Sequence, residues 1–169
     1  MSVRKTASEN IETRSILFHP WSDASLQHTF GNKPIIDFEG RPMFAELAIA
    51  ETLKKEGYST RWAETYGRGN KLPLFLTEWL DRPYGEQKDV PIVEQWILDI
   101  LAGIASLNNG SYAGCWDVLA WKGDKLLFVE SKRNKRDSVR DSQVAWLEAG
   151  LKYGLTPENF LVVQWDFAE

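Results

Sequence analysis

The sequence predicts an α/β domain with a mixed β-sheet, and three observations lead to this fold class. Segments with helical and strand periodicity follow one another in the order helix, strand, helix, strand, strand, helix, strand. A Gly-Asp pair between two strand-like runs predicts a hairpin in the second half of the chain. The 169 residues are enough for one domain with a buried core, and 43% of them are apolar.

The N-terminal part has little periodic signal. Residues 1–15 are polar and are expected to be flexible. Residues 16–42 contain proline, glycine and aromatic side chains without a sustained period, so we expect irregular chain with a short strand at 34–38. The regular core is expected to span 43–166, within a single domain of residues 1–169.

Two helices and one strand of the core are expected before the hairpin, with a loop-rich segment between them. Good helix formers predict a helix at 43–56, and alternating side chains predict a strand at 58–64. Residues 65–90 are rich in loop-forming residues, and their apolar run at 74–80 is compatible with a short helix. The most apolar segment, 91–107, predicts a helix with proline in its first turn and an Asn-Asn-Gly stop.

The apolar face of the helix at 91–107 has two interpretations. We favour a helix that packs in the core, and the alternative is a dimer interface. The apolar side chains of this face are Ile92, Val93, Trp96, Ile97, Ile100, Leu101 and Ile104.

The hairpin and the elements after it complete the expected sheet. Two strand-like runs, 114–121 and 125–132, are joined by a two-residue turn at 123–124. A helix at 138–153 and a last strand at 159–167 follow. The predicted fold class is therefore α/β with a mixed four-stranded sheet flanked by helices, in the order α-β-β-β-α-β, with an extra helix inserted before the hairpin.

The hairpin register brings two carboxylates together. With the turn at 123–124, Asp117 lies opposite Glu130, and Lys132 lies on the same face one step further along. Opposed like charges destabilise a sheet, so a cation is expected between them. Mg²⁺ prefers oxygen ligands and is often held by one or two carboxylates, which points to metal-assisted hydrolysis of a phosphodiester. The alternative is a solvated cluster of charges on the surface.

The charge of the chain is uneven. The net charge is −4, which excludes a protein whose whole surface binds nucleic acid. Residues 114–140, however, contain 7 basic and 4 acidic side chains, so this segment is positive. Its basic residues are expected to contact a phosphate backbone, and the alternative is a solvated loop. The candidates for substrate binding are Arg133, Lys135, Arg136 and Arg140.

Composition argues against several other classes of protein. A single cysteine excludes a disulfide framework, and Cys115 is expected to be a buried small residue and not a nucleophile. His19 and His28 lack the spacing of metal ligands. The polar N-terminus does not look like a secretory signal, and no apolar run is long enough for a membrane helix. A cytoplasmic protein is expected.

The hairpin and the helix after it resemble the core of PD-(D/E)XK nucleases, the restriction-endonuclease-like superfamily. In that superfamily an Asp begins one strand and an acidic-x-Lys triplet lies on the next, as do Asp117 and Glu130-Ser131-Lys132 here. Trp116 stands where the family has a proline. The following helix is similar to that of the VRR-NUC branch, and the matching positions are Gln143, Trp146, Leu147, Gly150 and Gly154.

The resemblance implies a set of roles. Asp117, Glu130 and the main-chain carbonyl of Ser131 would bind Mg²⁺ or Mn²⁺. An acidic residue of the first core helix, Glu46 or its rival Glu51, would join them through water. Lys132 would orient or activate the attacking water.

Gln143 has two interpretations. The resemblance implies that it holds Lys132 or a substrate phosphate. Its place on the apolar stripe of its helix is consistent with this, because a buried amide needs hydrogen-bond partners. The alternative is a structural glutamine that bonds to backbone groups.

The resemblance also implies the activity, a Mg²⁺-dependent nuclease with DNA as the expected substrate. A second copy of the chain or a larger repair or defence complex is the expected partner. The alternatives are a catalytically inactive module of the same fold that binds nucleic acid or a protein, and a structural α/β domain whose charged hairpin is only surface.

Overall fold

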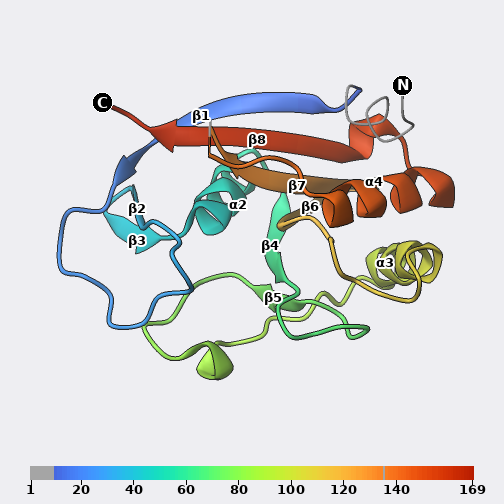
Figure 1. Ribbon diagram of the computed structural model, residues 1–169, viewed down its shortest axis with the longest axis horizontal. Coiled ribbons are helices and arrows are strands. Elements are labelled where there is room, and N and C mark those ends of the chain that lie inside the picture. Colours follow the sequence, from blue (N-terminus) through green and yellow to red (C-terminus); the bar gives the residue numbers. More distant parts are fainter. Residues whose placement is uncertain (1–9, 135) are drawn as a thin grey trace.

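The computed structural model describes residues 10–134 and 136–169, which form one α/β unit around an eight-stranded mixed open sheet. Figure 1 shows the sheet crossing the molecule, with helices on both of its sides. The strands are β1 Glu12–Pro20, β2 Ile36–Phe38, β3 Arg41–Met43, β4 Ser59–Glu64, β5 Leu74–Leu76, β6 Val118–Lys122, β7 Lys125–Arg133 and β8 Phe160–Phe167. The helices are α2 Ala45–Lys55, α3 Gln95–Leu107 and α4 Asp141–Tyr153, with short 3-10 turns at Tyr84–Glu86 and Pro157–Asn159.

The strand order is β3-β2-β1-β8-β7-β6-β4-β5. β8 lies between β7 and β1 and is parallel to both, whereas the other neighbours are antiparallel. The first and the last strand of the sheet in chain order are therefore neighbours, as the blue and red ribbons of Figure 1 show.

Alternate side chains of the central strands enter two separate apolar clusters, one on each face of the sheet. Val118, Ala120, Leu127 and Val129 pack with α2, whereas Leu119, Trp121, Leu126 and Phe128 pack with α3 and α4. This alternation follows from the two-residue repeat of a strand. The domain thus has three layers, with α2 on one face of the sheet and α3 and α4 on the other.

Several expected elements are confirmed within four residues at either end. The helices α2 and α4, the strands β4 and β8, and the hairpin β6–β7 lie where the sequence predicts them. Glycines end the two helices: Gly57 has φ 98° and Gly154 has φ 126°. These values favour glycine, which has no Cβ to clash in the left-handed region.

The expected sheet of four strands is wrong, because the observed sheet has eight. The four central strands β8, β7, β6 and β4 correspond to the expected ones. The prediction of irregular chain over 16–42 missed β1 and β3, although the short strand at 34–38 corresponds to β2. β1 leaves only Phe18 buried, so it lacks the apolar alternation that marks a strand. Of the segment expected to be flexible, residues 1–9 lie outside the described residues, and 12–15 belong to β1.

Two other expectations are corrected. The apolar run at 74–80 is not helical, because its first three residues form β5 beside β4. The helix α3 begins at Gln95 and not at Pro91, because the preceding residues are tied to β5 through the Val90 N–H, which donates to the Phe75 carbonyl at 2.7 Å.

The apolar face of α3 lies mainly in the core. Ile92, Ile97, Leu101 and Ile104 are buried in the cluster shared with α4, as the core interpretation expects. Val93 is 82% exposed and precedes the helix. None of the helices in the described residues is long and apolar enough to cross a membrane.

Candidate active site

The hairpin β6–β7 has the register that the sequence predicts. Leu119 pairs with Phe128, and Lys122 pairs with Lys125 across the turn. Gly123 has φ 61°, which suits the glycine-first turn expected from the Gly-Asp pair. Asp117 lies one residue before β6, where the pairing ends at Val118 and Val129.

Two reciprocal hydrogen bonds join the carboxylates of Asp117 and Glu130 to the backbone of each other's strand. The Asp117 N–H donates to Glu130 Oε1 at 3.2 Å, and the Ser131 N–H donates to Asp117 Oδ2 at 3.0 Å. The Asp117 carbonyl also accepts a hydrogen bond from the Ala63 N–H of β4 at 2.8 Å. The two acidic side chains are thus fixed side by side at the end of the hairpin.

Glu130 is a buried acid with one cationic partner. Its exposed fraction is 0%, and Lys132 Nζ lies 3.0 Å from its Oε2. Burial raises the pKa of Glu130 well above its ordinary value, and the charge of Asp117 raises it further, while Lys132 opposes the shift. A second cation beside this pair would therefore favour the ionised form.

Lys132 is held from two sides. Its Nζ donates to Gln143 Oε1 at 2.9 Å in addition to its ion pair with Glu130. Gln143 Oε1 also accepts the Arg140 N–H at 2.8 Å, at the beginning of α4. The expected contact between Gln143 and Lys132 is therefore present. The same Oε1 atom also accepts a backbone N–H, so the contact of the structural interpretation is present as well.

Gly114 allows α4 to approach the start of the hairpin. A Cβ on Gly114 would lie 2.0 Å from the Ser142 carbonyl oxygen, and its φ is 85°. Trp116 adds a second link, because its Nε1 donates to the Gln143 carbonyl at 3.0 Å. This close packing brings Gln143 within reach of Lys132.

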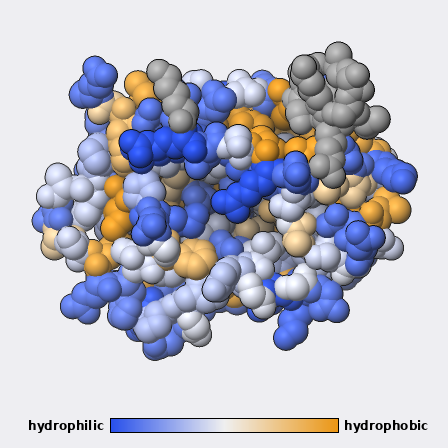
Figure 2. All heavy atoms as spheres, viewed as in Figure 1, coloured by the Kyte–Doolittle hydropathy of each residue, from blue (hydrophilic) through white to orange (hydrophobic). Residues whose placement is uncertain are grey.

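A cavity of about 810 Å³ lies over these residues. Its lining includes Asp117, Glu130, Ser131, Lys132 and Gln143, so the structure brings all of these predicted site residues together. Figure 2 shows a largely hydrophilic face, with some of the most hydrophilic side chains near its middle.

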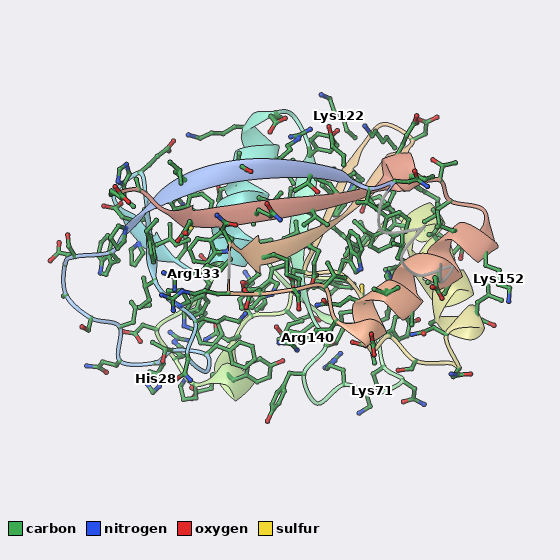
Figure 3. All side chains as sticks on the ribbon, turned by 45° about the horizontal axis from the view of Figure 1, so that its top comes forward. His28, Lys71, Lys122, Arg133, Arg140 and Lys152 are labelled. Atoms are coloured by element: carbon green, nitrogen blue, oxygen red, sulfur yellow. The ribbon has the colours of Figure 1, made fainter. Side chains whose placement is uncertain are left out.

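The predicted basic residues differ in their environments. Arg136 and Arg140 are exposed and line the cavity. Arg133 also lines it, but its guanidinium lies over the rings of Trp165 and Phe167, at 5.4 and 5.0 Å from their centroids. Lys135 lies outside the described residues. In the view of Figure 3, Arg133 and Arg140 lie near the middle of the molecule, and Lys122 and Lys152 lie at its periphery.

Glu46, and not Glu51, lines this cavity. Glu46 is buried, and Lys33 Nζ lies 3.0 Å from its Oε2. Burial raises the pKa of Glu46 to about 7, the charges of Asp117 and Glu64 add to this, and Lys33 opposes it. Glu51 instead pairs with Arg41 at 3.6 Å.

Sequence reasoning missed Lys33 and Glu64, which also line the cavity. Burial alone would lower the pKa of Lys33. The nearby carboxylate of Glu46, together with Asp117 and Glu64, has the larger effect, so the pKa of Lys33 is raised. Burial likewise raises the pKa of Glu64. Glu64 could have been suspected from the sheet. It is the last residue of β4, and because β4 is antiparallel to β6, its end lies near the start of β6 and near Asp117. Lys33 lies in an irregular segment and gives no local signal.

The donor set fits a hard divalent cation only in part. Within residues 10–134 and 136–169, no three His, Cys, Asp or Glu side chains are grouped closely enough to hold a metal ion. Asp117 and Glu130 would therefore need the Ser131 carbonyl, water and substrate phosphate as further ligands, which is an arrangement that Mg²⁺ accepts. The chemistry of the donors fits, since two carboxylates and a carbonyl are hard oxygen ligands.

The weaker candidates gain no support, although Cys115 also lines the cavity. Cys115 is buried, and burial, with the charges of Glu130 and Asp117, raises the pKa of its thiol well above the ordinary value. This environment disfavours the reactive thiolate, in agreement with the expected buried residue. His19 and His28 are not among the residues that line the cavity.

Comparisons with protein-family models, with curated proteins and with solved structures found no match to this chain.

Proposed function

We propose that the protein is a metal-dependent nuclease that hydrolyses phosphodiester bonds of nucleic acid, with DNA as the first substrate to test. The observation that supports this most is the reciprocal bonding of Asp117 and Glu130 beside Lys132, within a cavity that also contains arginines. Buried acids with raised pKa values beside a lysine are unfavourable for stability, so a functional role is a natural reason for them.

Each residue has a role in this proposal. Asp117, Glu130 and the carbonyl of Ser131 would bind Mg²⁺ or Mn²⁺, with Glu46 as an outer partner. The bound ion supplies a Lewis acid for the scissile phosphate. An ammonium has three N–H groups, and Lys132 donates one of them to Gln143 while it forms an ion pair with Glu130. A remaining N–H can donate to the attacking water or to a phosphate oxygen, where negative charge develops in the transition state.

Arg136 and Arg140 would bind the phosphates on either side of the cleaved bond. Both are exposed at the cavity, so they can contact a polyanion without the cost of burying an unpaired charge. Arg133 would contribute mainly positive potential, because its guanidinium lies over the rings of β8.

One observation favours the second candidate function, a nuclease-like module that binds nucleic acid without cleaving it. The described residues contain no group of three ligating side chains. Such a module would bind nucleic acid equally well with and without Mg²⁺, and its affinity would fall steeply with salt.

The first experiment titrates Mn²⁺ into the wild type and into Asp117→Asn by calorimetry. Cleavage assays with Mg²⁺ follow, on single-stranded DNA, double-stranded DNA and RNA. Asp124→Asn is the matched control, because Asp124 is exposed in the turn of the same hairpin. The proposal expects saturable binding and cleavage in the wild type and the control, and loss of both in Asp117→Asn.

Thermal melts must show that all three proteins are folded. Because some metal sites fill only when substrate phosphate is present, the titration is repeated with an uncleavable phosphorothioate oligonucleotide. Cleavage that persists in Asp117→Asn would overturn the proposed site. Nucleic-acid binding without any cleavage would favour the binding module.

A further inference from the structure

A cluster of aromatic rings lies beside the candidate site. The nuclease proposal gives these rings no role. We call Phe30, Tyr66 and Tyr84 the ring cluster. The Phe30 ring lies 4.9 Å from that of Tyr84 in a stacked arrangement and 5.9 Å from that of Tyr66 in an edge contact. Tyr66 and Tyr84 are 6.1 Å apart and perpendicular. Phe30 lies between β1 and β2, Tyr66 lies between β4 and β5, and Tyr84 begins the 3-10 turn after β5.

The ring cluster is anchored to the core. Phe30 also stacks on Trp79, with centroids 6.0 Å apart, and contacts the buried Trp62 at 6.2 Å. Trp79 is itself fixed, because its Nε1 donates to the His28 carbonyl at 3.0 Å. A ring held in this way loses little conformational freedom when another ring stacks on it.

Tyr66 remains open to solvent despite these contacts. Its exposed fraction is 69%, while its N–H donates to Glu64 Oε1 at 3.0 Å. Single exposed apolar side chains are common and need no explanation. Here, however, Phe30 and Tyr66 line the same cavity as Asp117 and Glu130. Both residues thus border the space in which a substrate would lie.

The walls of the cavity differ in chemistry. One part of the lining is cationic and comes from the segment between β7 and α4, with Arg136 and Arg140. The acidic part is Asp117 and Glu130 at the hairpin, and the aromatic part is Phe30 and Tyr66 in the N-terminal half. A ligand that satisfies all of these groups has both anionic groups and a flat ring. A nucleotide has both, and base–aromatic stacking is largely independent of sequence.

We propose that Tyr66, supported by Phe30, stacks on an unpaired nucleobase of the strand bound at Asp117 and Glu130. In a duplex the faces of each base are already stacked on neighbouring pairs, so only single strands and frayed or flapped ends offer a free base. The preferred substrate class is therefore unpaired nucleic acid. This inference rests on the proposed function for the location of the phosphate, but base stacking can be measured without cleavage.

The test measures binding in the Asp117→Asn protein with chelator, so that no substrate is cut. Fluorescence anisotropy compares a labelled single strand of about 12 nucleotides with the duplex of the same sequence. We expect tighter binding of the single strand. Tyr66→Ala is expected to weaken single-strand binding by about 5- to 100-fold and duplex binding much less.

Three further variants separate stacking from other effects of residue 66. Tyr66→Phe keeps the ring and is expected to retain binding, whereas Tyr66→Leu keeps an apolar side chain without a ring and is expected to lose it. Val93→Ala, at another highly exposed apolar residue, is expected to change nothing. Circular dichroism and thermal melts check that each variant is folded.

The outcomes distinguish this inference from the nuclease proposal. Equal affinity for single strand and duplex, or wild-type affinity in Tyr66→Ala, would overturn the stacking role even if Asp117-dependent cleavage is observed. Binding that depends on the ring at residue 66, without any cleavage in Mg²⁺, would support stacking and overturn the nuclease. An RNA strand of the same sequence forms a second arm, and ring-dependent binding of either sugar type supports the inference.

Discussion

The two walls of the cavity are built in different ways. The hairpin wall, Asp117, Glu130, Ser131 and Lys132, comes from two adjacent strands whose pairing is set by one turn. The N-terminal wall, Phe30, Lys33, Glu46, Glu64 and Tyr66, comes from two loops, a helix and the end of a strand. Local periodicity therefore specifies the first wall, whereas the second exists only after distant segments have packed together.

The difference also concerns charge. On the hairpin wall, Glu130 pairs with Lys132, and the carboxylates of Asp117 and Glu130 each accept a hydrogen bond from the backbone of the opposite strand. On the N-terminal wall, Lys33 pairs with Glu46 and faces Glu64 and Asp117. We therefore expect chemistry to depend on the first wall, and substrate selection and pH response to depend on the second.

The largest expected effect is on the hairpin wall. Lys132→Met should lower cleavage by about 100- to 1,000-fold, because the transition state loses a positioned cation, while Mn²⁺ binding persists. Lys125→Met, at the exposed beginning of the same strand, is the matched control and should cleave as the wild type does. Initial cleavage rates and calorimetry measure the two effects. A wild-type cleavage rate in Lys132→Met would contradict the proposed role of the hairpin wall in cleavage.

The joint between the hairpin and α4 predicts the next effect. Gly114→Ala should destabilise the fold by about 3 kcal/mol, because the new Cβ would meet the Ser142 carbonyl and the backbone has a positive φ. Gly123→Ala has a similar φ with open space around it, so it should cost about 1 kcal/mol. Urea unfolding midpoints measure both. Equal losses would show that the contact with α4 contributes nothing.

The N-terminal wall predicts a dependence of stability on pH. The pKa of Glu46 is about 7 in the folded protein, above its ordinary value of 4.5. A raised carboxyl pKa gives stability that is complete below the unfolded value and is lost as pH rises through the folded one. The wild type should therefore lose at most about 3 kcal/mol from this group between about pH 5 and pH 8.

Glu46→Gln should remove this part of the pH dependence, because an amide does not titrate. Its stability relative to the wild type should thus improve from about pH 5 to about pH 8, as measured by urea unfolding with chelator present. The exposed Glu158, which lies in the turn before β8, supplies the control Glu158→Gln, whose difference from the wild type should stay constant. A constant difference for Glu46→Gln as well would contradict the raised pKa.

The smallest effect concerns the exposed arginines. Arg140→Ala should weaken nucleic-acid binding by about 3- to 10-fold and lower the slope of log affinity against log salt by about one, because one phosphate contact is lost. Lys152→Ala, at the far end of α4, should leave both unchanged. Anisotropy titrations at several salt concentrations measure the slope. An unchanged slope in Arg140→Ala would place the phosphates elsewhere.

How far the sequence predicts this molecule depends on the range of the interactions. The hairpin register and the place of Asp117 beside Glu130 were predictable, because one turn determines them. The contact of Lys132 with Gln143 was implied only by the family resemblance, which offered a substrate phosphate as the other partner of Gln143. The strand β1 was not, since its pairing with β8 depends on residues over one hundred positions away and its side chains are mostly exposed. Lys33 was missed because it lies in an irregular segment without a local signal. The roles of all site residues stay predictions.

The parallel pairing of β1 with β8 has a consequence for biosynthesis. In the sheet order, β8 separates β1, β2 and β3 from the hairpin, so these three strands have no place in the sheet until β8 is made. During synthesis, β1 would therefore find its partner in the sheet only after β8 has been made. Such long-range pairing slows folding. The hairpin can therefore form early from local contacts, whereas β1, β2 and β3 join the sheet late.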